Sequence, residues 1–437
     1  MNTQPNPSTV AYILKGFPRL SETFIANEIY LLESMGLNLK LFSVKQGEKQ
    51  QHDVIEKIRA PLQYCPPTSS LSATTLLSWL KQNWPNYRNP NMRVFKRRPL
   101  AYMSTLAQVL WMTLRYRRSI FAKPKKVFIK EFLQAVFIAD ELLTSTDIGH
   151  LHGHFCHGAT TITWFISKLT GLSYSFTAHA KDIYQKQLNP GDLLHKKIHS
   201  SRFVATCTGA NHSHLCEMSG EPKQIHTIYH GLDTQFFQPD ATQRVTNPPV
   251  ILSVGRFVEK KGFDILIEAC AQLKIRGIKF NCNIIGPPDE SSDKVKSLIK
   301  HYQLESNIQL LESVNQTELR QHYLKSTLFC LPCRIIADGD RDGIPNVMVE
   351  AMASGLPCIS TNISGIPELI KDRHNGLLVE PDQVSEMTDA LILLLSDEVM
   401  RSRLSQIARQ TVLKDFDSSQ TTAELKMLFQ QCLLAYG

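Results

Sequence analysis

The feature that most restricts the fold of this chain is a regular alternation of short apolar runs with longer segments of helical periodicity. The run at 250–254, for example, precedes a segment from Phe263 to Leu273 whose apolar residues recur at helical spacing. Short apolar runs between turn residues are typical of strands buried on both faces, and their alternation with helices favours a parallel sheet. The sequence therefore predicts an α/β fold built from doubly wound parallel sheets.

The expected strands fall into two series, and 437 residues are too many for one ordinary core. The first series comprises the runs at 10–14, 39–44, 148–152, 173–177, 203–206 and 225–228. The second comprises the runs at 250–254, 280–286, 308–311, 328–332 and 357–360. A polar stretch with three prolines, from Pro239 to Pro249, separates the two series. We therefore expect two Rossmann-like domains, at about 1–240 and 245–415.

The chain carries no recognisable targeting or anchoring segment. Its first residues have neither the basic region nor the apolar core of a secretory signal, and no apolar run approaches the roughly 18 residues that span a bilayer. The ten cysteines are scattered and lie mostly in apolar runs, as reduced core thiols do. Cys330 and Cys333 have no second pair at zinc spacing. We therefore expect a cytoplasmic protein without disulfides or a zinc site.

One stretch of the chain is strongly basic. No Asp or Glu occurs between Lys57 and Lys130, whereas 15 Lys and Arg residues do, and the whole chain has a net charge of +8. Such a one-sided field indicates a polyanionic partner. The part from about 66 to 126 does not follow the α/β rhythm, and we expect it to be an insert of one or two helices in the first domain.

The insert has the composition of an interfacial helix, with apolar residues at helical spacing followed by cations. The residues are Leu106, Leu110, Trp111 and Leu114, then Arg115, Arg117 and Arg118. We therefore predict peripheral attachment to an anionic membrane surface. The alternative is that the leucines pack on the first domain and the cations are solvated. Nucleic acid is not expected as a partner, because no nucleic-acid-binding module accompanies the basic residues.

A first candidate site is the turn after the strand at 250–254. The strand ends at Gly255 and a helix begins after Gly262, with Arg256, Lys260 and Lys261 between them. Parallel sheets bind ligands outside the carboxyl ends of their strands. Arg offers a planar fork to phosphate oxygens, and Lys offers a point charge. The turn is a candidate phosphate site, and a solvated basic loop is the alternative.

A second candidate site contains Asp342 and Glu350 on either side of Pro345, a residue that suits the first turn of a helix. Asp342 then precedes the helix, and Glu350 lies on its second or third turn. The amino terminus of a helix offers N–H groups and a positive dipole end to an anion, and a carboxylate nearby can accept hydrogen bonds from sugar hydroxyls. The alternative is a capping acid and an unrelated helical Glu.

The histidines His152, His154 and His157 suggest a metal site by spacing alone. A strand end followed by glycine is unlikely to place all three side chains on one face. We therefore predict no metal here, and we regard His154 as a candidate residue on the acceptor side.

Both motifs resemble those of the large family-four type of retaining glycosyltransferases. These enzymes have the GT-B architecture, in which two Rossmann-like domains face each other across a cleft. Further segments agree with the family, in the same order along nearly the whole chain, at 17–28, 176–184, 228–233 and 365–379. The first of them resembles the branch that builds bacterial exopolysaccharides, colanic-acid-like enzymes included. The resemblance also implies that a last helix, at about 418–434 in the segment 416–437, returns to the first domain.

The resemblance implies roles for residues of the second domain. Arg256 and Lys261 would hold the donor diphosphate, and Glu350 would hold the donor ribose. Asp342 would contact the transferred sugar, although the family usually has Glu at this position. The residues that lead into the helix, Gly343, Ile344 and Pro345, would complete the donor side.

In the first domain, the acceptor-side domain, the resemblance implies two further residues. The family's central histidine lies near the donor sugar and corresponds to His179. The glycine turn beneath the diphosphate corresponds to Gly16, although the usual double glycine is absent.

The implied activity is transfer of a sugar, with retention, from a UDP- or GDP-linked donor to a saccharide or lipid-linked saccharide acceptor. The acceptor hydroxyl attacks from the face that the nucleotide leaves, and a phosphate oxygen takes its proton. No metal cofactor is implied, because Arg and Lys do the work of Mg²⁺. The alternatives are a nucleotide-sugar epimerase of the same architecture and a non-catalytic, membrane-bound scaffold; the presence of Arg256, Lys261 and Glu350 argues against the scaffold.

Overall fold

The computed structural model describes residues 8–19, 22–48, 53–71, 75–117, 124–240 and 247–435. The chain divides into two compact units, and each is described by itself. Unit 1 comprises Met1–Thr206, His212–Ile228 and Thr422–Gly437, and unit 2 comprises Cys207–Asn211 and Tyr229–Thr421.

The segment before the expected boundary at 240–245 belongs to unit 2. Phe237 is 1% exposed in the core of that unit, and the Thr234 hydroxyl donates a hydrogen bond to Asp417. These contacts fix the segment to unit 2 although it precedes the proline-containing stretch. Residues 241–246, the middle of that stretch, lie outside the described part of the chain.

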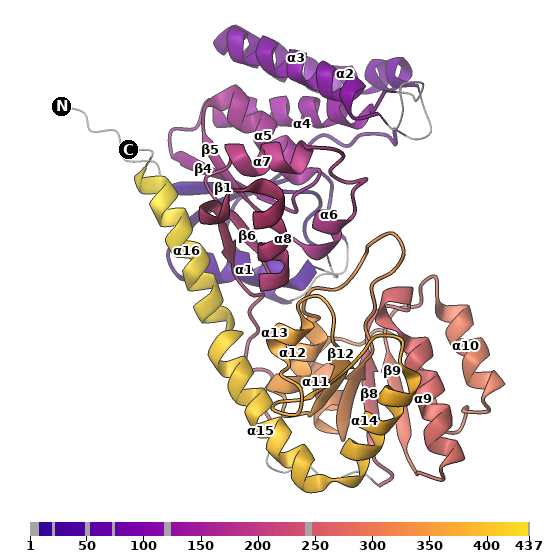
Figure 1. The fold of residues 1–437 in the computed structure, drawn as a ribbon. Coiled ribbons are helices and arrows are strands. Elements are labelled where there is room, and N and C mark those ends of the chain that lie inside the picture. The colour runs from indigo at the N-terminus through magenta and orange to yellow at the C-terminus, as the bar shows by residue number, and fades with distance from the viewer. Residues whose placement is uncertain are drawn as a thin grey trace. The chain divides into compact units, whose positions relative to one another are not determined.

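Within its described residues, unit 1 contains a seven-stranded sheet with the strand order β3-β2-β1-β4-β5-β6-β7 (Figure 1). Its strands are β1 (Thr9–Leu14), β2 (Asn38–Ser43), β3 (Leu62–Tyr64), β4 (Ile148–His154), β5 (Ser173–Ala178), β6 (Val204–Thr206) and β7 (Ile225–Thr227). Every neighbouring pair is parallel. The order runs outward from β1 in one direction and from β4 in the other, so the two central strands mark the topological switch point.

Helices cover both faces of this sheet. The helices of the amino-terminal half are α1 (Thr23–Ser34), α2 (Leu76–Arg97), α3 (Pro99–Arg115), α4 (Val127–Leu142), α5 (Ala159–Thr170), α6 (Ala180–Tyr184), α7 (Leu193–Ser200) and α8 (Gly209–Ser219). Ala11 and Ile13 of β1 share a core with α4 and α5. Tyr12 and Leu14 point to the other face, where α1 and the last helix, α16 (Ser418–Leu434), complete a second core.

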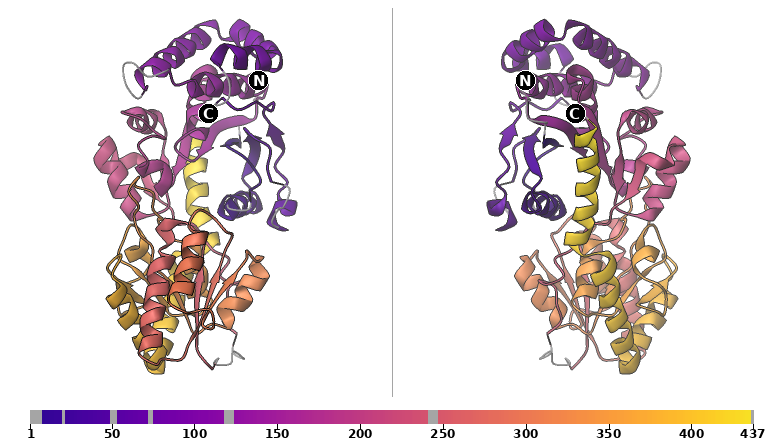
Figure 2. Two further views of the ribbon diagram at one scale, coloured as in Figure 1. Left: turned by 90° about the vertical axis from the view of Figure 1, so that its right-hand side faces the viewer. Right: turned by 90° about the vertical axis from the view of Figure 1, so that its left-hand side faces the viewer.

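The basic insert forms α2 and α3, which lie as a further layer on α4 and α5 (Figure 2). Trp79 of α2 is fully buried, and α3 buries Val109 and Met112. One expectation for α3 is wrong. Leu106 is not on the exposed apolar face but is partly buried against the core of unit 1, because it lies on the same side of the helix as Val109.

Unit 2 is built in the same way. Its described strands form a six-stranded sheet in the order β10-β9-β8-β11-β12-β13, and the neighbouring pairs are parallel. The strands are β8 (Val250–Val254), β9 (Asn281–Ile285), β10 (Ile308–Leu311), β11 (Leu328–Leu331), β12 (Cys358–Thr361) and β13 (Leu377–Val379). The helices are α9 (Phe263–Ile275), α10 (Ser292–His301), α11 (Gln316–Leu324), α12 (Asn346–Ala353), α13 (Ile366–Leu369), α14 (Val384–Ser396) and α15 (Glu398–Asp415).

The predicted fold class, two parallel α/β sheets, is confirmed. The sequence did not reveal β3 or β13, which are edge strands of three residues each. The strands β6 and β7 are as short, but their predicted runs, at 203–206 and 225–228, extend one residue further. None of the described helices is both long and apolar enough to cross a membrane. The ten cysteines all fall within the described ranges; they are free thiols there, and all but Cys216 are buried.

The turn before α9 requires glycine, and this requirement can be tested. Gly262 has a φ of +66°, and a Cβ atom there would lie 1.9 Å from the carbonyl oxygen of Pro332. Gly277 has a φ of +72° but open space around it. Gly277→Ala should lower the free energy of unfolding by about 1 kcal/mol through backbone strain alone. Gly262→Ala should lower it by about 3 kcal/mol, because the clash adds to the strain. Urea denaturation of both variants measures the difference, and equal losses would contradict the role of the clash.

Candidate functional site

The candidate residues cluster at the carboxyl ends of the central strands in each unit. In unit 1, Gly16 follows β1 and His154 ends β4. In unit 2, Gly255 and Arg256 follow β8, and Asp342 follows β11. Both pairs of strands are switch points, where neighbouring loops diverge and leave room for a ligand. The fold therefore places the sequence candidates where an open parallel sheet binds its substrates.

In unit 2, the turn after β8 joins the two sequence motifs. Glu259–Lys261 form a single 3₁₀ turn, and the Lys261 Nζ atom lies 2.7 Å from Asp342 Oδ2. Lys260, which was not assigned a role from the sequence, lies 3.3 Å from Asp342 Oδ1 and 3.1 Å from Asp340 Oδ1. The structure thus brings Lys261 and Asp342 together and adds Lys260 and Asp340 to the cluster.

This cluster is charged although it is buried. Burial by itself would raise the pKa of Asp342, but Lys261 and Lys260 outweigh that effect and hold the pKa well below its usual value. Burial would likewise lower the pKa of Lys261, and Asp342 reverses the shift and raises it. The Arg256 charge acts on Lys261 in the opposite direction. Asp342 and Lys261 are therefore both ionised at neutral pH, and Asp340 is a second carboxylate within reach of Lys260.

Arg256 lies at the surface beside this cluster. Its side chain is 51% exposed and forms an ion pair of 3.2 Å with Asp289. An exposed pair of this kind contributes little to stability, so the guanidinium can exchange Asp289 for another anion at small cost. The fold leaves Arg256 available to a ligand.

Glu350 lies apart from the lysines, on α12. Its carboxylate accepts a hydrogen bond of 2.8 Å from the hydroxyl of Tyr323, a residue that the sequence did not suggest. Burial raises the pKa of Glu350 to about 7, and the Tyr323 hydrogen bond opposes this shift. A carboxylate that is ionised only near neutral pH is an unusual structural residue and a reasonable binding group.

The residues between Asp342 and Glu350 form the amino terminus of α12. Gly343 and Ile344 lead into the helix, and Pro345 is its N-cap, with a φ of −66° and a ψ of 124°. The helix starts at Asn346, one residue later than the sequence suggested, and Glu350 lies on its second turn. The first N–H groups of α12 therefore come a few residues after Asp342 in the sequence.

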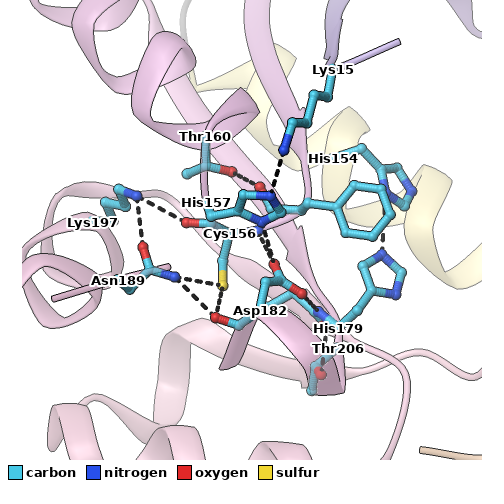
Figure 3. Close-up of polar contacts among 12 residues, drawn as sticks. Lys15, His154, Cys156, His157, Thr160, His179, Asp182, Asn189, Lys197 and Thr206 are labelled. Carbon is cyan, nitrogen blue, oxygen red and sulfur yellow. Dashed lines mark hydrogen bonds and ion pairs between the residues drawn. The ribbon is translucent and has the colours of Figure 1, made fainter. Parts of the chain in front are cut away.

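In unit 1, His152, His154 and His157 contact three different partners, and Figure 3 shows those of His154 and His157. The Nε2 atom of His152 lies 3.1 Å from Thr177 Oγ1. The Nδ1 atom of His154 lies 3.2 Å from Nε2 of His179. His157, in the turn after β4, accepts a hydrogen bond of 3.0 Å from Lys15 Nζ. The structure brings together His154 and His179, which the sequence placed in separate motifs.

His179 is the N-cap of α6. Its backbone N–H donates to Asp182, and its side chain accepts from the backbone N–H of Asp182. Asp182 also accepts from the backbone N–H of Cys156. Asp182 was not predicted as a site residue, although an acid three residues after an N-cap is the signal of a capping box.

A buried cation lies beneath this edge and was also missed. Lys197 is 0% exposed, and its Nζ atom donates to the carbonyl of Cys156 and to Asn189 Oδ1, both at 2.9 Å. Burial lowers the pKa of Lys197 and raises that of nearby Glu131. Next to Lys196 in the sequence, Lys197 looks like one of two solvated cations, and no sequence signal distinguishes it.

Gly16 lies in unit 1, just after β1. A Cβ atom at this position would meet Arg19 at 3.7 Å and Lys45 at 3.8 Å, which are ordinary contacts. The fold itself therefore does not require glycine there, and close approach of a ligand remains the reason suggested by the sequence.

The comparisons with known proteins agree with this geometry. Residues 234–411 match the model of the family described as "Glycosyl transferases group 1". A protein of Salmonella typhimurium that carries the name of a colanic acid biosynthesis glycosyltransferase is 28% identical over 438 residues, which cover 96% of this chain and 99% of that protein. The amylovoran biosynthesis glycosyltransferase of Erwinia amylovora is 36% identical over 182 residues, which cover 42% of this chain and 44% of that protein.

The fold is also that of solved structures. The structure of HepE from Anabaena, in complex with UDP and glucose, has a TM-score of 0.67 and 14% identity, and it covers 97% of this chain and 99% of its own. The two parallel-sheet units define a two-domain protein with the GT-B fold. The match over residues 234–411 and the similarity to a named glycosyltransferase over nearly the whole chain support glycosyltransferase activity. None of the findings favours an epimerase or a scaffold.

The ion network of unit 2 predicts unequal effects of two similar substitutions. Asp342→Asn leaves two buried lysines without their shared carboxylate and should lower the free energy of unfolding by about 3 kcal/mol. Asp389→Asn breaks an ion pair with Arg276 whose side chains are 47% and 65% exposed, and it should cost less than about 1 kcal/mol. Chemical denaturation at neutral pH compares them. Similar losses in both variants would mean that the lysines are solvated.

Proposed function

We propose that this protein is a retaining hexosyltransferase that moves a sugar from a UDP- or GDP-linked donor to a saccharide or lipid-linked saccharide during exopolysaccharide assembly. The observation that carries the proposal is the cluster of Arg256, Lys260 and Lys261 at the carboxyl edge of the unit 2 sheet, where Arg256 is half exposed and its ion pair with Asp289 lies at the surface. The names of the Salmonella and Erwinia relatives support the exopolysaccharide pathway. The UDP bound to HepE supports a nucleotide donor.

In the proposed donor site, an exposed cation and a buried cation bind the two phosphates of the donor. Arg256 takes one phosphate with its exposed guanidinium, and Lys261 takes the other from the buried cluster. The ionised Glu350 accepts hydrogen bonds from the ribose hydroxyls, and Asp342 orients the transferred sugar. Lys261 forms an ion pair with Asp342, so a bound diphosphate and Asp342 compete for the same ammonium group.

Departure of the nucleotide is the step that these charges assist. As the bond to the anomeric carbon breaks, negative charge grows on the diphosphate, and Arg256, Lys261 and the first N–H groups of α12 stabilise it. The acceptor hydroxyl attacks from the same face, and the departing phosphate oxygen takes its proton. We propose that no divalent ion takes part, because the cations of the protein supply the neutralising charge.

The same charges predict a large loss of turnover in two variants. Arg256→Ala and Lys261→Ala should each lower kcat/KM by roughly 30- to 1000-fold, the equivalent of about 2–4 kcal/mol for one charge-assisted contact in the transition state. Assays of sugar transfer should contain a chelator, and the wild type should keep its activity in it. The matched control is Arg276→Ala, which removes an equally exposed, ion-paired Arg elsewhere in unit 2. Unchanged kcat/KM in both site variants would exclude these residues, and rescue by a divalent ion would exclude the metal-free mechanism.

Nucleotide binding should depend on pH through Glu350. Its pKa is about 7, and only the ionised form accepts hydrogen bonds at both oxygens. Affinity for UDP or GDP should therefore rise on the order of tenfold between pH 6 and pH 8, as the ionised fraction grows from about a tenth to about nine tenths. Glu350→Gln should bind more weakly at pH 8, and its remaining pH dependence should be that of the nucleotide alone. Calorimetry measures the nucleotide affinity of the wild type and of Glu350→Gln at each pH. Identical pH profiles would refute the ribose role.

We further propose that α3 attaches the enzyme to an anionic membrane. The face of α3 away from the core carries large apolar side chains that are about half exposed or more: Leu100 (86%), Met103 (53%), Leu110 (50%), Trp111 (46%) and Leu114 (54%). Lys96, Arg98 and Arg115 are exposed near its two ends. The alternative, in which α3 only packs on unit 1, accounts for its buried face and leaves this outer face unexplained.

The charge of the insert fits anionic lipid headgroups. Asp140 neutralises part of the charge, because it pairs with Arg93 and Arg97. Each remaining cation near an anionic surface contributes roughly 1 kcal/mol, so a cluster supports reversible attachment. No nucleic-acid partner is proposed, and the apolar face argues for lipid.

Liposome flotation tests the attachment. The wild type should float with anionic vesicles at low salt and much less at high salt or with neutral lipid. The variant with Leu110→Ser, Trp111→Ser and Leu114→Ser should lose flotation. The control changes two apolar residues of unit 2 that are more exposed than these three residues of α3, Ile275→Ser and Val399→Ser, at 75% and 80%. No flotation of the wild type with anionic vesicles at low salt would make the insert a structural element only.

A further inference from the structure

Strand β4 carries three buried histidines on one face, at alternating positions. His150 and His152 are 0% exposed, and both ring nitrogens of each lie within hydrogen-bond distance of hydroxyl groups of β5. Burial lowers the pKa of both, to about 3 for His150, so these two rings are neutral. His154 is the third of the series, at the carboxyl end of the strand, and its partners differ.

His154 lies between another histidine and a carboxylate. Its Nδ1 atom faces Nε2 of His179 at 3.2 Å, and its Nε2 atom lies 3.5 Å from Oε1 of Glu28 on α1. That nitrogen is buried and makes no hydrogen bond of usual geometry within the described chain. The same Glu28 oxygen accepts a hydrogen bond of 3.0 Å from the hydroxyl of Tyr12. These four residues form a continuous row within unit 1.

The direction of each hydrogen bond in the row can be assigned. The side chain of His179 accepts from the backbone N–H of Asp182, and its Nε2 atom is the one that meets His154. The accepting nitrogen is therefore Nδ1, which carries no proton, and the neutral ring has its proton on Nε2. That N–H donates to Nδ1 of His154, so the proton of a neutral His154 is also on Nε2 and points at Glu28.

At the far end of the row, Glu28 supplies a hydrogen-bond acceptor and Tyr12 a donor. Glu28 offers only acceptor oxygens when ionised. Burial and the nearby Glu28 raise the pKa of Tyr12 well above its usual value, so the phenol keeps its proton and donates it to Glu28. Each donor in the row thus faces an acceptor, and the contact between His154 and Glu28, at 3.5 Å, is the longest of the three. A carboxylate that holds a histidine in one tautomer for a second group is a known device of enzyme sites.

We propose that Tyr12, Glu28 and His154 are positioning residues that hold the ring of His179 in the Nε2–H tautomer. The inference rests on the proposed function and on the place that the family resemblance implies for His179, beside the donor sugar. An Nε2–H group donates to a sugar hydroxyl, which shares or takes over the place of His154 as its acceptor. The other tautomer would present a lone pair there. The neighbouring His150 and His152, which have hydroxyl partners, lack such a carboxylate.

Histidine tautomers can be measured without any substrate. In protein with ¹⁵N-labelled histidine rings, two-bond NMR correlations should show His154 and His179 as Nε2–H tautomers in the wild type. Glu28→Leu removes both acceptor oxygens and should give His154 a population of the Nδ1–H form. Glu28→Gln keeps one carbonyl oxygen at this place and should restore the wild-type pattern. Glu33→Leu, on the same helix, is the matched control. Single substitutions of His154 and His179 assign the signals.

The kcat for sugar transfer should depend on the tautomer of His179. With UDP-glucose or GDP-mannose as donor, Glu28→Leu should lower kcat by about tenfold, the value of one misplaced hydrogen bond. Its affinity for UDP or GDP alone should not change, since these lack the sugar. Glu28→Gln should recover most of the rate, and Glu33→Leu should leave it intact. If Glu28→Leu fails to fold, His154→Phe removes the acceptor of His179 and supplies the same two measurements.

The outcomes separate the relay from the proposed function. An Nδ1–H tautomer of His154 or His179 in the wild type, or an unchanged pattern in Glu28→Leu, would overturn the relay. A changed pattern with unchanged kcat would overturn its role in turnover. If the wild type turned over neither donor while the NMR pattern was as expected, the row would stand and the choice of donor would be wrong.

Discussion

The constraint on which the rest of the structure depends is that a parallel sheet must be covered on both faces. In unit 1, α4 and α5 cover one face, and α1 covers only part of the other. The missing cover comes from the end of the chain, because Leu425 and Phe429 of α16 complete the core beside Tyr12. With both faces closed, polar groups can reach solvent or substrate only at the ends of the strands. The position of every candidate site residue follows from this.

The strand ends hold charge at a cost that pairing offsets. A buried ion is expensive unless it has partners, and Asp342 has two lysines while Lys197 has two oxygens. The networks around Lys197 and Lys261 have different roles. Lys197 is satisfied by a carbonyl and an amide and holds the loop after β4 in place. Lys261 shares Asp342 with Lys260, and Arg256 beside them pairs with Asp289 only at the surface, so this site is suited to admit an anion.

The repeating elements of the fold were predictable from the sequence, because buried strands and amphipathic helices leave a period. The short edge strands β3 and β13 leave none. In the site, Arg256, Lys261, Asp342 and Glu350 stand in motifs. Tyr323, the partner of Glu350, does not, since it comes from another element and is chosen by three-dimensional contact. Lys260 lies in the same turn as Lys261, but the sequence does not show that it also contacts Asp342. Leu106 was misplaced for a similar reason, because helical spacing alone does not tell which side of α3 faces α4.

Position along β4 decides what each of its histidines can do. Within the sheet, His150 and His152 can reach only the hydroxyl groups of β5, and burial keeps them neutral. At the carboxyl end the neighbouring loops diverge, and α1 and α6 bring Glu28 and His179 within reach of His154. The same residue type is therefore structural in the middle of the strand and suited to a functional role at its end. A sequence pattern of alternating histidines cannot show this difference, since only the three-dimensional surroundings supply the carboxylate.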